Sequence, residues 1–207
     1  NLKKWMKSER VMPTLTTFGT RSKIIKEPKG LTLVVSPWNY PFNLTFGPMM
    51  SSIAAGNTVI IKPSEMTPNM SGVISGIVTE AFRPEEVAIF EGKSEVASYL
   101  TSLPFDHIFF TGSPTVGKHV MAAAAKHLTS VTLELGGKSP VIIDKSADIK
   151  KTIGSIAWGK FTNNGQTCIA PDYLYVHESI KDRVISEMKA CIEKQYGLGA
   201  DARGHDD

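Results

Sequence analysis

Cysteine is scarce in this chain of 207 residues, which contains only Cys168 and Cys191. Two cysteines exclude a disulfide framework, and a structural zinc site would lack its usual thiolate ligands, so no metal is expected. Long apolar runs are also missing: none approaches the roughly 18 residues of a membrane span, and no secretory leader opens the chain. These absences predict a cytoplasmic protein without a membrane span.

The sequence contains no cluster of like charges. The 23 Lys and Arg exceed the 20 Asp and Glu by only three, and they form no dense basic run. A nucleic-acid partner is therefore not indicated. Hydrophobic residues make up 42% of the chain, which is too many for a disordered protein. The length allows one ordinary domain, or one domain and part of a second.

From residue 31 onward, short apolar segments alternate with amphipathic ones. Such alternation is the signature of βαβ units, whose parallel strands are buried on both faces. It predicts an open, doubly wound α/β domain up to about residue 133. The expected strands are 31–35, 58–61, 87–90, 107–110 and 130–133, and the expected helices are 44–55, 67–81, 95–102 and 114–127.

A smaller second unit is expected over residues 134–196. Two strands and two helices are too few to close a substantial core, so this unit is expected to be the beginning of a second α/β domain. Residues 197–207 lack an apolar period and are expected to be a tail. The expected strands of the second unit are 139–143 and 173–176, and its expected helices are 147–161 and 178–195.

The N-terminal segment, residues 1–30, is polar and irregular. A short strand is expected at Thr14–Phe18. The segments Ser22–Lys26 and Leu31–Val35 are expected to be strands joined by the turn Glu27–Gly30, because proline and glycine favour a chain reversal. The segment therefore predicts a hairpin.

A glycine-containing segment follows one expected strand and opens the next expected helix. Backbone N–H groups at a helix N-terminus bind phosphate, and glycine lets the backbone come close to it. Gly112, Gly117 and Lys118 match a P-loop, but His119 stands where Ser or Thr would hold Mg²⁺. A dinucleotide site with a looser glycine spacing and a simple helix cap are the alternatives at this point.

The two cysteines have different surroundings in the sequence. Cys168 lies in the polar segment Asn163–Pro171, which is expected to be a loop, so this thiol is a candidate for reactivity. A small buried hydrophobe is the alternative for Cys168. Cys191 falls on the apolar stripe of the last helix and is expected to be a core residue.

Polar residues stand at the ends of several expected strands. Glu134 lies between two leucines, where burial would raise its pKa and suit it to act as a general base; a Glu facing water is the alternative. Asn39 follows the first buried strand, where its amide would donate to an oxyanion or form a turn. Lys62 and Glu65 end the next strand. Because doubly wound folds bind ligands beyond the carboxyl ends of their strands, these residues are expected to share one site.

Five short motifs occur in one order along the chain, and their order is informative. They are Pro37–Pro41, Lys62–Glu65, Phe110–Ser113, Leu133–Lys138 and Gly165–Cys168. Together they resemble the NAD(P)-dependent aldehyde dehydrogenase superfamily. The run 160–175 is most similar to the class 3 branch, which includes enzymes of the coniferyl-aldehyde type. The resemblance covers the chain from about residue 24 to residue 196.

The resemblance implies an enzyme that oxidises an aldehyde to a carboxylic acid with NAD or NADP. Cys168 would be the nucleophile, Glu134 the general base, and Asn39 an oxyanion donor beside the backbone N–H of Cys168. Residues 31–133 would be a Rossmann-like dinucleotide-binding domain, and residues 134–196 the N-terminal part of the catalytic domain. The residues that would bind the cofactor are Trp38, Lys62, Glu65, Gly112, Ser113, Val116, Gly117 and Leu135.

The chain departs from the family pattern after Cys168. The family's later Glu-x-Phe-Gly-Pro segment does not occur, so the resemblance implies a fragment with impaired activity. The region before Leu31 resembles part of the family's oligomerisation arm, which implies a homodimer. Glu65 favours the free 2′-hydroxyl of NAD by charge, although class 3 relatives accept either cofactor. A non-catalytic cofactor-binding remnant and a P-loop nucleotide hydrolase are the alternative functions.

Overall fold

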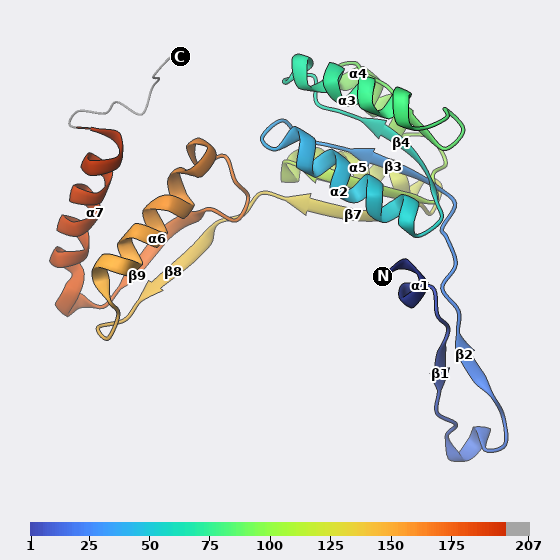
Figure 1. Cartoon of the computed structure of the whole chain (residues 1–207), viewed down its shortest axis with the longest axis horizontal. Coiled ribbons are helices and arrows are strands. Elements are labelled where there is room, and N and C mark those ends of the chain that lie inside the picture. Colours follow the sequence, from blue (N-terminus) through green and yellow to red (C-terminus); the bar gives the residue numbers. More distant parts are fainter. Residues whose placement is uncertain (198–207) are drawn as a thin grey trace. The chain divides into compact units, whose positions relative to one another are not determined.

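The computed structural model describes residues 1–197 of the chain. The chain divides into two compact units, Asn1–Leu135 and a smaller one that begins at Gly136 (Figure 1). Apart from Gly197, the expected tail lies outside the described residues. Within the described residues, no helix combines the length and the apolar character that crossing a membrane requires. The functional domain boundaries predicted from the sequence stay predictions.

The first 30 residues form an arm with a two-stranded antiparallel ribbon. The expected strand Thr14–Phe18 is wrong, because this segment forms a 3-10 turn. Thr14 and Thr17 stabilise the turn, since each side chain bonds to the other residue's backbone N–H. The elements of the arm are α1 (Leu2–Trp5), β1 (Glu9–Val11), η1 (Leu15–Thr17) and β2 (Ser22–Ile24).

The expected hairpin between Ser22–Lys26 and Leu31–Val35 is also wrong. β2 pairs with β1, and residues 31–35 form a strand of a different, parallel sheet. The apolar run at 31–35 is buried on both faces, which a two-stranded ribbon cannot provide. The segment after β2 therefore connects the arm to the sheet.

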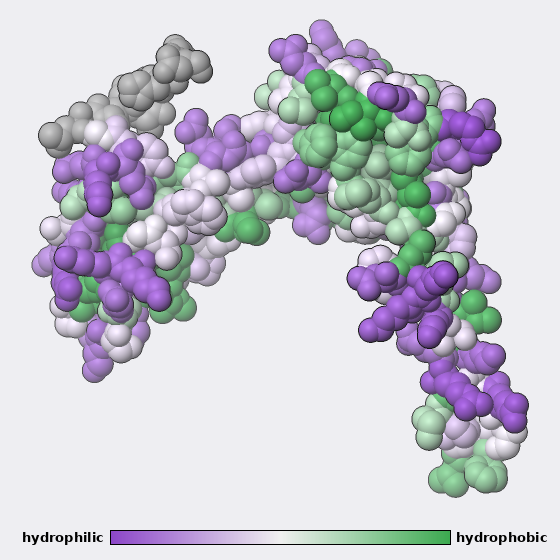
Figure 2. Space-filling view, viewed as in Figure 1, coloured by the Kyte–Doolittle hydropathy of each residue, from purple (hydrophilic) through white to green (hydrophobic). Residues whose placement is uncertain are grey.

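The arm exposes large apolar side chains around η1. The exposed fractions are 84% for Met12, 97% for Leu15 and 85% for Phe18. Figure 2 shows hydrophobic residues gathered at the end of the arm that holds this turn. Solvated single apolar residues are ordinary, but a group of them at the end of an extended ribbon is typical of a contact surface.

The unit that begins at Gly136 packs two parallel strands on two helices. Its core contains Ile143, Ile149, Ile153 and Val184, and Cys191 packs against this core as expected. The elements are β8 (Ser139–Ile143), α6 (Ile149–Phe161), η2 (Thr162–Gly165), β9 (Pro171–Val176), η3 (Glu178–Ile180) and α7 (Lys181–Tyr196).

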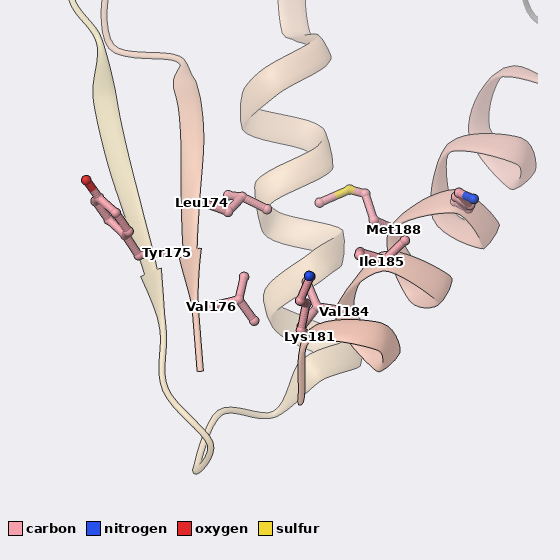
Figure 3. A pocket seen from close by; sticks show the side chains of 8 residues that line it. Leu174, Tyr175, Val176, Lys181, Val184, Ile185 and Met188 are labelled. Carbon is pink, nitrogen blue, oxygen red and sulfur yellow. The ribbon is translucent and has the colours of Figure 1, made fainter. Parts of the chain in front are cut away.

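A sheet of two strands leaves much of this smaller unit uncovered. Ile142 of β8 is 78% exposed and Tyr175 of β9 is 61% exposed. An apolar groove of about 540 Å³ also runs between β9 and α7 (Figure 3). The unit therefore has a small core and two apolar surfaces that face water. The labelled residues of the groove are Leu174, Tyr175, Val176, Lys181, Val184, Ile185 and Met188.

The larger unit contains a five-stranded, wholly parallel sheet in the order β5-β4-β3-β6-β7. Helices connect the strands, so the predicted doubly wound α/β fold is confirmed. The strands are β3 (Leu31–Val35), β4 (Thr58–Lys62), β5 (Val87–Ile89), β6 (His107–Gly112) and β7 (Ser130–Leu135). The helices are α2 (Pro41–Ala54), α3 (Pro68–Ala81), α4 (Ser94–Thr101) and α5 (Pro114–Ala125).

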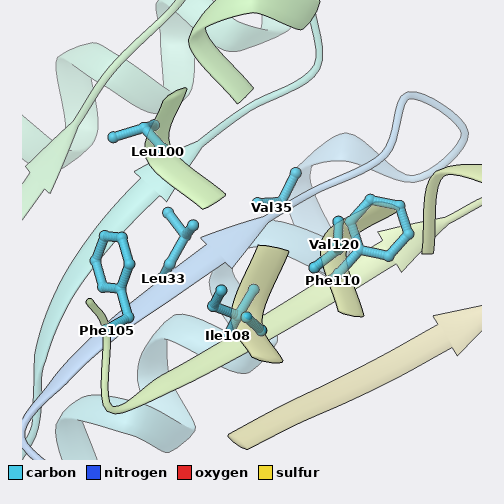
Figure 4. Packing of buried hydrophobic residues seen from close by; sticks show 8 residues of the cluster. Leu33, Val35, Leu100, Phe105, Ile108, Phe110 and Val120 are labelled. Atoms are coloured by element: carbon cyan, nitrogen blue, oxygen red, sulfur yellow. The ribbon is translucent and has the colours of Figure 1, made fainter. Parts of the chain in front are cut away.

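Alternate residues of the central strand β3 point into two separate cores. Leu33 and Val35 join a cluster with Leu100 of α4 and Val120 of α5 (Figure 4). Val34 joins the other cluster, which packs against α2 and α3. Because both faces of the strand are buried, its sequence is continuously apolar rather than alternating.

The chain order reverses beside β3. From β3 the chain proceeds outward to β4 and β5, and it then returns to the other side of β3 to form β6 and β7. The connections after β3 and β6 therefore run away from each other at the carboxyl edge. This topological switch point leaves a crevice between them, which is where open α/β sheets bind ligands.

Candidate functional site

A cleft of about 680 Å³ opens at the carboxyl ends of β3, β4 and β6. It lies at the switch point and is lined by the loops after these strands and by α4 and α5. The structure thus brings together six residues that the sequence predicts to bind a cofactor. They are Trp38, Lys62, Glu65, Gly112, Ser113 and Val116.

The other two predicted cofactor residues, Gly117 and Leu135, do not line the cleft. Gly117 is buried in α5, where a Cβ atom would lie 2.9 Å from Cδ2 of Leu135. The glycine therefore allows α5 to pack closely on β7. These two residues position the N-terminus of α5, and their direct contact with a cofactor stays a prediction.

Lys62, the last residue of β4, places a buried ammonium in the cleft wall. Its side chain is 3% exposed, and its Nζ lies 2.5 Å from Oε2 of Glu65. Burial alone would raise the pKa of Glu65, but the hydrogen bond from Lys62, a backbone hydrogen bond at Glu65 and the positive charge of Lys62 together hold that pKa below its usual value. The pair is thus a fixed donor and acceptor set at the end of a buried strand.

The N-terminus of α5 points its first turn at the same cleft. Ser113 is the N-cap, and its Oγ accepts a hydrogen bond of 3.2 Å from the backbone N–H of Val116. Pro114 follows at the first helical position, where its missing N–H costs nothing. The helix dipole and the remaining N–H groups favour an anion here. Lys118, the lysine of the P-loop alternative, does not line the cleft.

Asn39 lies in the loop between β3 and α2 and is half-buried. The start of α2 anchors this loop, because Thr45 Oγ1 donates to Ser36 Oγ at 2.7 Å and lies 2.6 Å from the carbonyl oxygen of Pro41. Trp38, one residue before Asn39, is 40% exposed and lines the cleft. The loop therefore carries an indole in the cleft wall and an amide next to it.

The expected burial of Glu134 is wrong, because its side chain is exposed. β7 is an edge strand, and alternation along it turns Leu133 and Leu135 toward the core under α5. Glu134 points to the opposite face, and among the described residues no strand pairs with the outer edge of β7. Successive side chains of a strand point to opposite faces of the sheet. The two leucines beside Glu134 therefore indicate that the other face is buried, and they carry no information about the surroundings of Glu134.

Sequence reasoning missed Thr111, which pairs with Glu134 across β6 and β7. Paired residues of neighbouring strands lie on the same face, about 4.8 Å apart along the hydrogen-bonding direction. Thr111 Oγ1 is buried and has no hydrogen-bond partner among the described residues. The signal in the sequence was a threonine inside the strand-end motif beside Gly112.

Cys168 lies in the smaller unit, in the connection between η2 and β9, and it is exposed. Three successive residues before it, Asn163, Asn164 and Gly165, have positive φ angles of 53°, 53° and 74°. Asn and Gly are the residues that tolerate this conformation best. A turn closed by the Ala170 N–H and the Thr167 carbonyl then presents Cys168 at the surface.

A second segment of the smaller unit, at Gly137, lies in close contact with the backbone of Cys168. A Cβ atom on Gly137 would lie 2.5 Å from the backbone carbonyl oxygen of Cys168, which real Cβ atoms do not approach so closely. Gly136, by contrast, has open space around its Cα. Gly137 is therefore the residue that allows the strand connection and the cysteine loop to lie in contact.

The chemistry available at these residues falls into two parts. The cleft of the larger unit offers a helix N-terminus for an anion, and a buried lysine paired with an exposed glutamate for hydroxyl groups. The smaller unit offers an exposed thiol on a tightly fixed turn. A thiol is a nucleophile in its thiolate form, and it adds to electrophilic carbonyl carbon.

Known proteins with this sequence pattern are numerous. The family model described as "Aldehyde dehydrogenase family" matches residues 3–203. The 4,4'-diaponeurosporen-aldehyde dehydrogenase of Staphylococcus aureus is 51% identical over 196 residues, which are 95% of this chain and 43% of that protein. Aldehyde dehydrogenase family 3 member H1 of Arabidopsis thaliana is 45% identical over 95% of this chain and 41% of that protein. The mouse "Aldehyde dehydrogenase, dimeric NADP-preferring" is 45% identical over 99% of this chain and 45% of that protein.

Solved structures agree with the sequence comparison. The substrate-bound state of Staphylococcus aureus AldH superposes with a TM-score of 0.90 at 50% identity, covering 96% of this chain and 43% of that one. An Escherichia coli NADP-dependent enzyme superposes with a TM-score of 0.85 at 31% identity, covering 93% and 40%. The chain spans a little over two fifths of the length of these relatives. The resemblance found in the sequence is confirmed: the chain belongs to the aldehyde dehydrogenase family.

Proposed function

We propose that the protein carrying this chain oxidises an aldehyde to a carboxylic acid with NAD or NADP, using Cys168 as the nucleophile. The observation that carries the proposal is the cleft at the switch point, where buried Lys62 with its exposed partner Glu65 and the N-terminus of α5 lie together in a member of this family. An ammonium, a carboxylate and a helix N-terminus are the groups that a ribose and a pyrophosphate require.

The residues of the cleft fit a dinucleotide. Lys62 Nζ has three N–H donors, and Glu65 accepts one of them. The remaining donors and the second carboxylate oxygen would bind the adenosine ribose hydroxyls. The first turn of α5, from Gly112 to Val116, would bind the pyrophosphate. A bound nicotinamide would supply the acceptor for the hydride, which is the chemistry that the side chains cannot supply.

The cleft favours NAD over NADP by charge. Because the pKa of Glu65 is held low, this side chain is an anion at neutral pH, and it would repel a 2′-phosphate. The mouse relative is named as an enzyme that prefers NADP, and the similar Escherichia coli enzyme is described as NADP-dependent. We therefore propose either cofactor for the protein, with NAD bound more tightly.

In the first half of the proposed reaction, the Cys168 thiolate attacks the aldehyde carbon and forms a C–S bond. The carbonyl electrons move to oxygen, where the amide of Asn39 and the backbone N–H of Cys168 would stabilise the oxyanion. When the oxyanion collapses, the carbon loses a hydride, and a thioester remains on Cys168. The carbon is thereby oxidised by two electrons, which leave with the hydride.

In the second half, Glu134 would take a proton from a water molecule, and the resulting hydroxide attacks the thioester. The C–S bond breaks, the acid leaves, and the thiolate of Cys168 is restored. The exposure of Glu134 suits this role, because a base that activates water needs access to water. A base separate from the nucleophile is also free to act while Cys168 is acylated.

We further propose that the arm mediates contact between two copies of the protein. Its exposed apolar residues around η1 require a partner surface, and a relative with 45% identity is named dimeric. Within the described part of the chain, the outer edges of β1 and β2 pair with no other strand, and such edges pair readily with a strand of another copy.

A binding experiment on the 207-residue chain tests the cofactor site. Lys62→Met should raise the NAD dissociation constant about tenfold or more, because a charged hydrogen bond to the ribose is lost. Glu65→Gln should raise the ratio of NADP to NAD affinity. Isothermal titration calorimetry measures both.

Lys118→Met is the matched control for Lys62→Met, since it removes the same charge from the same unit outside the cleft. NAD affinity should be unchanged. If Lys118→Met abolished nucleotide binding while Lys62→Met did not, the P-loop alternative would replace the dinucleotide site.

A chimera tests the catalytic roles. Residues 1–196 would replace the matching segment of the Staphylococcus aureus relative, and NAD(P)H formation from hexanal and benzaldehyde would be followed. Cys168→Ala should abolish turnover. Glu134→Gln should retain the burst of NAD(P)H but slow the steady state by about 10²-fold, because only thioester hydrolysis needs the base. Normal turnover of Cys168→Ala, or an inert unsubstituted chimera, would contradict the proposal.

A pair of glycine substitutions tests how Cys168 is positioned. Gly137→Ala should displace the Cys168 carbonyl and lower chimera turnover by about tenfold or more, since small misplacements of a reacting group cost rate steeply. Gly136→Ala places the same methyl group in open space and should leave turnover within about twofold. Equal effects of the two substitutions would show that the contact is not important.

The arm is tested by solution mass. Leu15→Ser combined with Phe18→Ser should convert a dimeric chimera to a monomer in sedimentation experiments, because the apolar contact surface is removed. Thr20→Ser, in the same arm, should leave the dimer intact. A dimer that survives the double substitution would exclude the η1 surface as the contact.

A further inference from the structure

The strand β9 begins with an irregularity that has no part in the proposed chemistry. Ser139 of β8 pairs with Pro171, and the next residue of β8, Pro140, pairs with Tyr173. Asp172 is therefore an extra residue of β9 with no opposite residue on β8. Proline has no N–H to donate to a regular ladder, and inside sheets it occurs at such bulges. A β-bulge beside an active site commonly redirects a side chain, and the side chain redirected here is a carboxylate.

The carboxylate of Asp172 lies beside two lysines that come from different segments of the smaller unit. Lys138, in the connection between β7 and β8, donates from its Nζ to Asp172 Oδ1 at 3.4 Å. Lys160, in the last turn of α6, has its Nζ 3.9 Å from the same oxygen. The Asp172 side chain is 30% exposed, so it is more shielded from water than either lysine. One carboxylate thus connects three segments by charge.

Each of these three segments also contacts or continues the cysteine loop, residues 163–171. The lysine before β8 directly follows Gly137, which lies against the carbonyl oxygen of the cysteine. The carbonyl oxygen of Lys160 would lie 3.0 Å from a Cβ atom on Gly165, so the end of α6 is also close to the loop. Asp172 is the residue that directly follows the loop. The charged group therefore lies where the segments that restrain the thiol meet.

We infer that Asp172, held by Lys138 and Lys160, is a positioning residue that fixes the cysteine loop for attack on the aldehyde. The inference rests on the proposed function, in which Cys168 is the nucleophile. Lys160 stands three residues before the loop and Asp172 directly after it, so their ion pair closes the base of the loop. A loop closed at its base samples fewer positions, and attack on a carbonyl carbon requires the sulfur within a narrow range of distance and angle.

The exposure of the network favours positioning over a contribution to global stability. Exposed ion pairs add little to the free energy of unfolding, and the side chains of Lys138 and Lys160 are 80% and 39% exposed. A local energy too small to change the unfolding midpoint still changes how often the loop holds the thiol in place, because populations depend exponentially on free energy. Loss of the network should therefore slow the chemistry and leave unfolding nearly unchanged.

The experiment uses the chimera described above and measures the burst of NAD(P)H by stopped flow, which reports the acylation of Cys168. Asp172→Asn should lower the burst rate about tenfold, because it keeps the shape of the side chain and removes its charge. Asp172→Glu, which retains the charge, should recover part of the rate. Substitution of both lysines by methionine should have the same effect as Asp172→Asn. The triple variant should be no slower, since the three residues act through one network.

Two further measurements separate positioning from other effects. Hydrogen–deuterium exchange of the peptide 163–171 should rise about threefold or more in Asp172→Asn, while exchange in α6 and α7 stays the same. Alkylation of Cys168 by iodoacetamide should stay within about twofold, because a small flexible reagent needs no fixed orientation of the thiol. The KM for NAD and the unfolding midpoint should also be unchanged. Asp182→Asn, which removes the same charge from an exposed position on α7, is the matched control.

An unchanged burst rate in Asp172→Asn overturns the inference, as does an equal loss in Asp182→Asn. A rise in exchange over the whole smaller unit, or a lower unfolding midpoint, overturns it in favour of a structural role. A parallel fall in the alkylation rate overturns it in favour of an effect on thiol reactivity. If Cys168→Ala keeps its turnover or the unsubstituted chimera is inert, the proposed function fails, and hydrogen exchange by itself still decides whether Asp172 fixes the loop.

Discussion

The parallel ladder around β3 is the constraint on which the larger unit depends. Val35, the last residue of β3, pairs with Lys62, the last residue of β4, on one side and with Phe110 of β6 on the other, so the three strands are in register and β6 continues only two residues farther, to Gly112. Every loop that follows these strands must then leave the sheet at one edge. The residues of the cleft come from segments far apart in the sequence, and they meet because their strands are in register and point the same way.

The buried Lys62 illustrates how this edge combines stability with function. A buried ammonium is costly unless it is paired, and Glu65 supplies the charge three residues later. Glu65 remains 40% exposed, so the pair is buried on the lysine side and open on the carboxylate side. Such a pair contributes little to stability compared with an apolar residue of the same size. Its value lies in presenting fixed donors and acceptors to the cleft.

The sequence was sufficient for features that depend on local pattern and strand direction. Continuous apolar runs predicted the buried parallel strands, and strand direction predicted that Lys62 and Ser113 would line one cleft. The environment of Glu134 was not predictable in this way. Its neighbours in the sequence belong to the opposite face of the sheet. What covers the face that carries Glu134 depends on the packing of the whole unit, which no short segment contains.

The predicted strand pairing of the arm was wrong for a related reason. Pro28 and Gly30 signal a break between two strands, but they do not say whether the strands on either side of the break pair with each other. In the structure, residues 25–30 are an irregular connection with a bend at Gly30. The pairing depends on where an apolar run such as Leu31–Val35 is buried on both faces, and among the sheets of the described residues the five-stranded one buries it in this way. The contact of Gly137 with Cys168 is likewise tertiary, since 31 residues separate the two in the sequence.

The cysteine loop combines two kinds of restraint that a reactive thiol needs. Positive φ angles at Asn163, Asn164 and Gly165 are tolerated only where the surrounding structure fixes them. From the other side, Gly137 brings a second segment against the Cys168 backbone. An exposed thiol on a free loop would sample many positions, and its attack on a carbonyl would lose the advantage of fixed orientation. Here the side chain is open to solvent, while the backbone that carries it is held on both sides.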